Sequence, residues 1–191
     1  MSEDHAPRFP VIENSLLQQL YHYWVGRRGE QLHPARADID PVDIPRLLPY
    51  LMLVDVVDDG QRFRFRLVGT RIAMGADPTG RFLHETVSPG LYGHHVMALY
   101  GKAARSARPL YTVFDYKFED RRVPGRIHRL FLPLSDDGAN VNMMLIGQVA
   151  ESARAVERSV WRSPPSEFRE HRLVFLDPDR PAGPAQRAGC R

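Results

Sequence analysis

The sequence predicts an α+β fold with a single antiparallel sheet. Several segments alternate apolar and polar residues with the period of a β-strand, and turn residues separate them. Two other segments carry apolar residues at spacings of three and four, as in a helix that packs on a core. A helix and then a hairpin come first, a helical region follows, and three longer strands come last. That order is typical of an α+β domain rather than of alternating βα units.

A first helix is predicted from Ser15 to about Val25. Asn14 or Ser15 provides an N-cap side chain, and Gly26 is the predicted stop. The helix has an apolar stripe made of Leu16, Leu17, Leu20, Tyr21 and Trp24. Because this stripe must be buried, the helix either covers the open face of the sheet or pairs with the same helix of a second subunit. The second alternative predicts a homodimer.

A proline-punctuated segment leads into the first hairpin. Prolines between Asp38 and Pro49 exclude one long helix or a central strand there. The run from Tyr50 to Val57 favours a strand, and Asp58-Asp59-Gly60 forms the turn. The next strand, 62–68, alternates, so one face is expected to hold Phe63, Phe65 and Leu67 and the other Arg62, Arg64 and Arg66. Burying each ring stabilises the fold by ~1.5–3 kcal/mol, so the aromatic face is expected to pack on the core.

The middle of the chain predicts short turns and then a second helix. Glycines and prolines interrupt residues 70–89, which leaves room only for single helical turns. The helix spans Leu91 to Ala107, and its buried face holds Tyr92, Val96, Leu99, Ala103 and Ala107. Three strands follow, at about 109–119, 126–134 and 141–150.

Composition and length predict one globular domain with extensions. The chain has 191 residues, 43% of them hydrophobic, and a formal net charge of +3. This mild charge does not call for nucleic acid as a partner.

The start of the chain lacks an export pattern and no apolar run could span a bilayer, so a cytoplasmic protein without membrane contact is expected. We expect a flexible arm at 1–13, the domain with its first helix at 14–150, and a charged, proline-containing tail at 151–191. The tail is predicted to be largely disordered after a short helix at about 151–161.

A family resemblance rests on several strings of residues. They are Trp24, Arg28-Gly29, DIDPVDIPRLLPYLMLVDV at 38–56, RFRFRLVGT at 62–70 and DPTGR at 77–81. Over about residues 15–150 the chain resembles a branch of the PAS domain family that occurs mostly in alphaproteobacteria, often as stand-alone domains. The resemblance implies five antiparallel strands in the order 2-1-5-4-3, with the helices on one concave face and a ligand pocket between them.

Candidate pocket residues follow from this implied face. They are Phe63, Phe65, Leu67, His95, Leu99, Phe114, Leu130, Leu132, Met143 and Leu145. A shift of one residue in the register of any strand would exchange its two faces. Possible contacts for an anionic group are Arg62, Arg64, Arg66 and Arg81, whose alternative role is a solvated surface.

The chain shows no catalytic motif. The one cysteine, Cys190, lies next to the end, so a covalent flavin inside the domain is excluded. No histidine spacing indicates a metal site, although His95 on the second helix is a candidate haem ligand by analogy with sensor PAS domains. The cofactor stays open.

We therefore expect a non-enzymatic sensory or regulatory module that binds a small ligand, a protein partner, or both. The alternatives are a structural adaptor whose core is filled by its own side chains, and a haem-based sensor.

Overall fold

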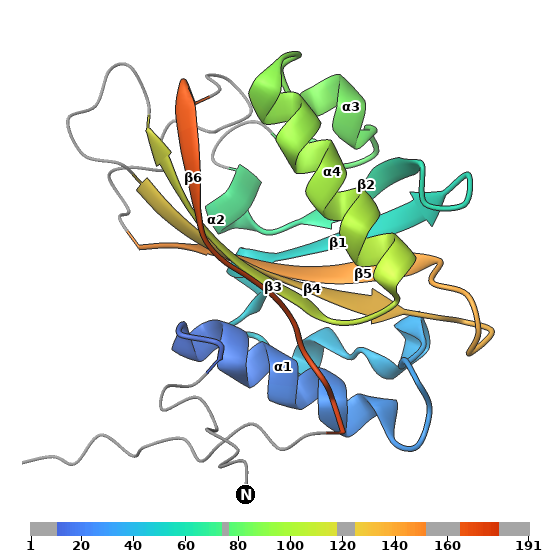
Figure 1. Cartoon of the computed structure of the whole chain (residues 1–191). Coiled ribbons are helices and arrows are strands. Elements are labelled where there is room, and N and C mark those ends of the chain that lie inside the picture. Colours follow the sequence, from blue (N-terminus) through green and yellow to red (C-terminus); the bar gives the residue numbers. More distant parts are fainter. Residues whose placement is uncertain (1–10, 74–76, 118–124, 152–164, 180–191) are drawn as a thin grey trace, which may run out of the picture.

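The structure, a computed structural model, describes residues 11–73, 77–117, 125–151 and 165–179. One antiparallel sheet of six strands crosses the molecule in the order β2-β1-β5-β4-β3-β6 (Figure 1). The strands are β1 (Leu51–Val57), β2 (Arg62–Val68), β3 (Leu110–Lys117), β4 (Gly125–Leu134), β5 (Met143–Ala150) and β6 (Glu167–Phe175). The predicted α+β class is confirmed. The prediction of five strands is wrong in number, because a sixth strand extends the order 2-1-5-4-3 beyond β3.

Helices cover both faces of this sheet, because the helices of the middle of the chain gather on one face and the first helix covers the other. Short helices α2 (Thr70–Ala73) and α3 (Leu83–Thr86) and the long helix α4 (Leu91–Ser106) lie on one side, and α1 (Ser15–Arg28) lies on the other (Figure 1). Three 3-10 helices, η1 (Arg36–Asp38), η2 (Pro41–Asp43) and η3 (Leu48–Tyr50), lead from α1 into β1. Among the residues described, no helix combines the length and apolarity that a membrane crossing needs.

Helix α1 covers the sheet through its apolar stripe, which is the first of the two predicted alternatives. Asn14 caps the helix, since its side-chain oxygen accepts hydrogen bonds from the backbone nitrogens of Leu16 and Leu17. Trp24 is fully buried, and its indole nitrogen donates to the carbonyl oxygen of Pro133 on β4 at 2.9 Å. The predicted stop at Gly26 is wrong, since this glycine has an ordinary helical backbone conformation and the helix continues to Arg28. It ends at Gly29, whose φ of +58° suits glycine.

The two faces of the sheet form two separate hydrophobic cores. The core beneath α4, here called the α4 core, holds aromatic rings that include Phe63, Tyr100 and Phe131. The core beneath α1, here called the α1 core, is mainly aliphatic. Adjacent residues on the inner strands β5, β4 and β3 point alternately into one core and the other, which explains why these strands are buried almost throughout.

A β-bulge on β2 changes which face each side chain takes. The pairs are Leu53 with Leu67 and Val54 with Phe65, so Arg66 is an extra residue on β2. The bulge reverses the alternation after Phe65, and Leu67 lies on the opposite face and is 44% exposed. The prediction that Leu67 shares a face with Phe63 and Phe65 is therefore wrong.

Strand β6 lies within the segment that the sequence analysis assigned to a largely disordered tail. It pairs with β3 along its length, with a bulge opposite Val113 and Phe114. Leu176, directly after the strand, is buried in the α1 core and its backbone nitrogen donates to the carbonyl of Pro109 at 2.8 Å. The predicted tail is thus wrong for residues 167–176. Residues 1–10 of the arm predicted at 1–13, residues 152–161 of the predicted helix and residues 180–191 lie outside the described residues.

Candidate functional site

A buried row of polar side chains crosses the sheet beneath α4. Arg129 on β4 lies opposite Thr112 on β3 and Gln148 on β5 in the strand ladders. All three are buried, with Arg129 only 4% exposed. Their neighbours along the chain point into the α1 core, so alternation directs the row towards α4. This places an arginine among the aromatic rings of the α4 core.

Only neutral groups contact the Arg129 guanidinium among the described residues. Nε donates to Oε1 of Gln148 at 2.5 Å, and Nη1 donates to the hydroxyl of Tyr116 at 3.4 Å. Tyr92 packs edge-on against Tyr116, with ring centroids 5.8 Å apart. No carboxylate in the described part of the chain forms an ion pair with Arg129.

The tyrosines around Arg129 are neutral at pH 7, and burial moves their pKa values further from neutrality. Loss of water raises the pKa of Tyr116 to about 12, and it raises the pKa of Tyr92 and of Tyr100. Burial acts to lower the pKa of Arg129, and interaction with Tyr116, Tyr92 and Tyr100 acts to raise it, so that the net pKa is raised. Arginine is in any case always charged in proteins. The cluster therefore holds one positive charge and no negative one at neutral pH.

His95 on α4 connects this cluster to the surface. Its Nε2 lies 3.4 Å from the Tyr116 hydroxyl, and its half-buried ring stacks on Phe168 of β6 with centroids 4.1 Å apart. Phe114 of β3 packs edge-on against the imidazole, with ring centroids 4.5 Å apart. Burial, and then the charge of Arg129, lower the pKa of His95 to about 4. The imidazole is therefore neutral at pH 7, and a polar chain runs from His95 through Tyr116 to Arg129.

These surroundings of His95 do not fit a haem. A haem iron would bind an imidazole nitrogen with open space beside it. Here Nε2 faces the Tyr116 hydroxyl and Phe168 covers the ring. Among the described residues, no group of three or more His, Cys, Asp or Glu side chains is placed to hold a metal ion.

The predicted pocket residues do not share one surface. Five of them lie on the side of α4, namely Phe63, Phe65, His95, Leu99 and Phe114. Four belong to the α1 core on the opposite face, namely Leu130, Leu132, Met143 and Leu145. On β4 and β5 the prediction chose the wrong set of alternate residues, because both alternate sets on these strands are mostly apolar. The residues that face α4 there are instead Arg129, Phe131, Met144 and Ile146.

The four arginines predicted to contact an anion already have partners in the chain. Arg64 donates to Asp55 at 2.8 and 3.0 Å, and Arg66 pairs with the same carboxylate at 3.3 Å. Arg62 pairs with Asp58 and lies 3.9 Å above the ring of Phe82. Arg81 donates to the carbonyl oxygen of Glu85. These contacts favour the alternative role of a solvated surface.

Sequence reasoning missed the polar row. In the sequence, the row is visible only as one polar residue within each of three largely apolar strands, at a position that faces α4. Arg129 lies on the face of β4 opposite Leu130 and Leu132. Because the wrong face was taken as the pocket, Arg129 was not a candidate.

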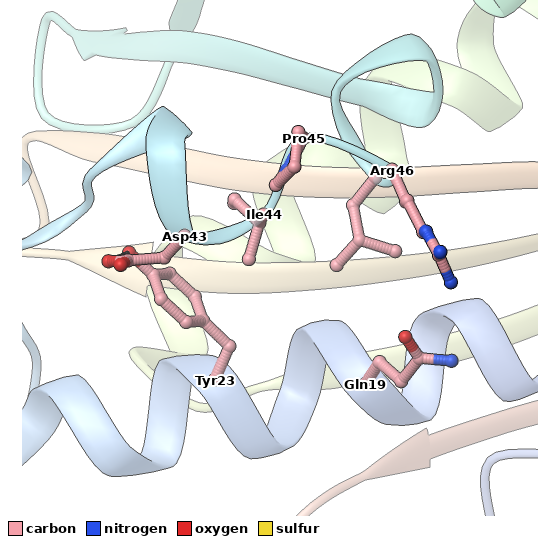
Figure 2. A pocket seen from close by; sticks show the side chains of 7 residues that line it. Gln19, Tyr23, Asp43, Ile44, Pro45 and Arg46 are labelled. Carbon is pink, nitrogen blue, oxygen red and sulfur yellow. Dashed lines mark hydrogen bonds between the residues drawn. The ribbon is translucent and has the colours of Figure 1, made fainter.

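A shallow groove of about 410 Å³ lies on the other side of the molecule, between α1 and the segment after η2 (Figure 2). Tyr23 and Gln19 line it from α1, and Asp43 to Leu47 line it from the opposite wall. The Tyr23 hydroxyl binds Asp43 and the backbone of Asp40, which ties the two walls together. The groove contains no buried unpaired charge, in contrast to the cluster beneath α4.

Comparison with known proteins identifies a family. The family model described as PAS domain matches residues 12–141, about two thirds of the chain. Neither the curated proteins nor the solved structures include a significant match.

Proposed function

Because the chain belongs to the PAS domain family, we propose that it is a non-catalytic sensory and signalling module that binds a small ligand, a protein partner, or both. The family supports the sensory role. The observation that supports ligand binding is the buried cluster of Arg129, Tyr116 and Gln148 beneath α4. The strings at 38–56 and 62–70 support membership of the stand-alone alphaproteobacterial branch, and a cytoplasmic location belongs to the same proposal.

Output to a protein partner would pass through β6 and α1. β6 contacts the ligand side through Phe168 and His95. It also contacts the start of the chain, since Arg172 on β6 donates to the carbonyl of Val11 at 2.9 Å and pairs with Glu13 at 3.1 Å. A shift of β6 would therefore reach the N-terminal cap of α1. A homodimer through α1 would have to use its outer side, since the stripe around Leu20 and Trp24 is buried on the sheet.

A structural adaptor with a self-filled core is the second candidate. The specific observation in its favour is the packing of rings beneath α4. Tyr100 lies 5.4 Å from Phe63 and 5.3 Å from Phe131. The haem-based sensor is not carried further, because the surroundings of His95 do not fit that group.

Titration of ¹⁵N-labelled protein with mixtures of small metabolites separates the first two functions. A ligand-binding module is expected to show shifts that gather on β3, β4, β5 and α4. Mixtures of acidic, basic and neutral compounds that all leave the spectrum unchanged would favour the adaptor.

A further inference from the structure

The cluster beneath α4 holds a charge that nothing in the described chain balances. Arginine is almost never fully buried unless it is paired, and an unpaired charge in a low-dielectric interior is destabilising. Arg129 is 4% exposed and contacts the amide of Gln148 and the hydroxyl of Tyr116. The three nearby tyrosines carry no charge at neutral pH. A small anion would supply the missing charge.

Three hydrogen-bonding groups meet at one place in this cluster. Nη1 of Arg129 and Nε2 of His95 each lie 3.4 Å from the hydroxyl of Tyr116. Both distances are at the long end for hydrogen bonds, so neither contact satisfies its groups well. A carboxylate oxygen at this place would accept a charge-assisted bond from Arg129 and a second bond from Tyr116, and such bonds are shorter and stronger.

The aromatic surroundings indicate what the rest of the ligand is like. Rings of Tyr92, Phe114 and Phe168 surround the His95–Tyr116 contact. One guanidinium balances one negative charge, so a monocarboxylate fits the site better than a phosphate with close to two charges. An apolar or aromatic body on the acid would bury its surface against these rings.

The cluster lies near the edge of the sheet that β6 forms. Phe168 stacks on His95 and belongs to β6, which pairs on one side only, with β3. Most side chains of β6 are exposed or half-buried. Because Phe168 contacts the rings of both His95 and Tyr116, its movement would give a ligand access to them without disturbing the interior strands.

We propose that Arg129 anchors the carboxylate of a small monocarboxylic acid with an apolar body, which enters between His95 on α4 and Phe168 on β6. This inference rests on the proposed ligand-binding function and names the chemical class of the ligand. Arg129 supplies the charge, Tyr116 donates the second hydrogen bond, and Phe168 covers the bound acid.

Benzoate and benzamide test the charge, because they share a ring and differ in the carboxylate. Each is titrated into the full-length protein, and binding is followed by ¹⁵N chemical shifts and by the thermal midpoint at constant ionic strength. Phenylacetate and inorganic phosphate complete the panel. We expect benzoate and phenylacetate to shift amides around Arg129 and His95, with benzamide and phosphate at least tenfold weaker.

Variants test the anchor. Arg129→Met should weaken benzoate binding at least tenfold, Arg129→Lys should keep part of it, and Phe168→Ala should speed association. Arg126→Gln is the matched control, because Arg126 lies on the same strand and pairs with Asp115 on the other side of the sheet. It should bind benzoate as the unchanged protein does. The urea midpoint of ligand-free Arg129→Met should be unchanged or raised.

Three results would overturn the inference. One is that neither carboxylate binds at millimolar concentration. Another is that Arg129→Met and the unchanged protein bind benzoate equally. The third is a large fall in the urea midpoint of ligand-free Arg129→Met, which would show that the charge is already balanced. If neutral compounds bind beneath α4 while the acids do not, the ligand-binding function stands and the carboxylate inference fails.

Discussion

Gly147 on β5 lies directly beneath Leu17 on α1, and a Cβ atom added to the glycine would stand 2.5 Å from Cδ2 of the leucine. Leu20 is equally close, at 2.6 Å. Both leucines are 1% exposed and packed in the α1 core. The missing side chain is therefore what lets the helix approach the sheet this closely.

Gly147→Ala is expected to lower the free energy of unfolding by about 1–3 kcal/mol, because the leucines must leave their rotamers or α1 must move away. Urea denaturation followed by tryptophan fluorescence, to which the buried Trp24 contributes, measures the effect. Gly26→Ala is the control within α1, where an added Cβ meets nothing within 4 Å. That change should stabilise by about 0.5–1 kcal/mol. Equal effects of the two substitutions would contradict the close packing.

Asn14→Ala should destabilise the protein by about 1 kcal/mol, since it removes the acceptor for the backbone nitrogens of Leu16 and Leu17. Asn14→Asp keeps an oxygen at the same place and should restore most of the loss. Thermal or urea unfolding compares the three proteins. A stable alanine variant would mean that packing of α1, and not its cap, holds the end of the helix.

His95 is expected to make stability fall in mild acid. Its pKa is about 4 in the folded protein and 6.5 is its ordinary value, so the unfolded chain binds the proton first. Stability therefore falls as the pH decreases from about 6.5 to about 4, by at most about 1.4 kcal/mol per pH unit. The partial exposure of the ring reduces this slope.

Urea denaturation between pH 7 and pH 4.5 measures the contribution of His95 by difference. His95→Gln removes the titrating group and should flatten the profile. His94→Gln is the matched control, because His94 is the exposed neighbour on the same helix. Parallel profiles for the unchanged protein and His95→Gln would show that the imidazole titrates as it does in the unfolded chain.

Removal of β6 should expose the edge of β3. A chain that ends after Glu151 loses the β3–β6 ladder and the cover of Phe168 over His95. Unpaired strand edges promote association, so light scattering should detect self-association and the thermal midpoint should fall. A chain that ends after Asp179 retains β6 and serves as the control. If both truncated proteins were monomeric and equally stable, β6 would add nothing to the fold.

The strands and helices predicted from periodicity are present, because each carries a pattern that needs no distant information. Phe63 and Phe65 are buried as their alternation predicts. Leu67 departs from the pattern because of the bulge at Arg66, which depends on the pairing of β2 with β1. Strand β6 was missed because its bulge breaks the alternation and its apolar residues gather at one end.

The candidate site shows the same limit. Leu130 and Phe131 are both apolar neighbours on β4, so their sequence cannot tell which faces α4. Arg129 was recognisable as a polar residue in an apolar strand. Its contacts with Gln148 and Tyr116, and the contact of Tyr116 with His95, bring together β4, β5, β3 and α4. These contacts depend on the tertiary fold and cannot be read from one segment.

The sequence by itself determined the α+β class, the family and the local elements, because short-range periodicity and turn chemistry act within a few residues. Only the tertiary structure decided that both faces of the sheet are covered, that a sixth strand extends it beyond β3, and that an arginine lies beneath α4 without an ion pair to any described residue. These features depend on which strands pair. Strand pairing is determined by the burial of apolar side chains that come from distant parts of the chain.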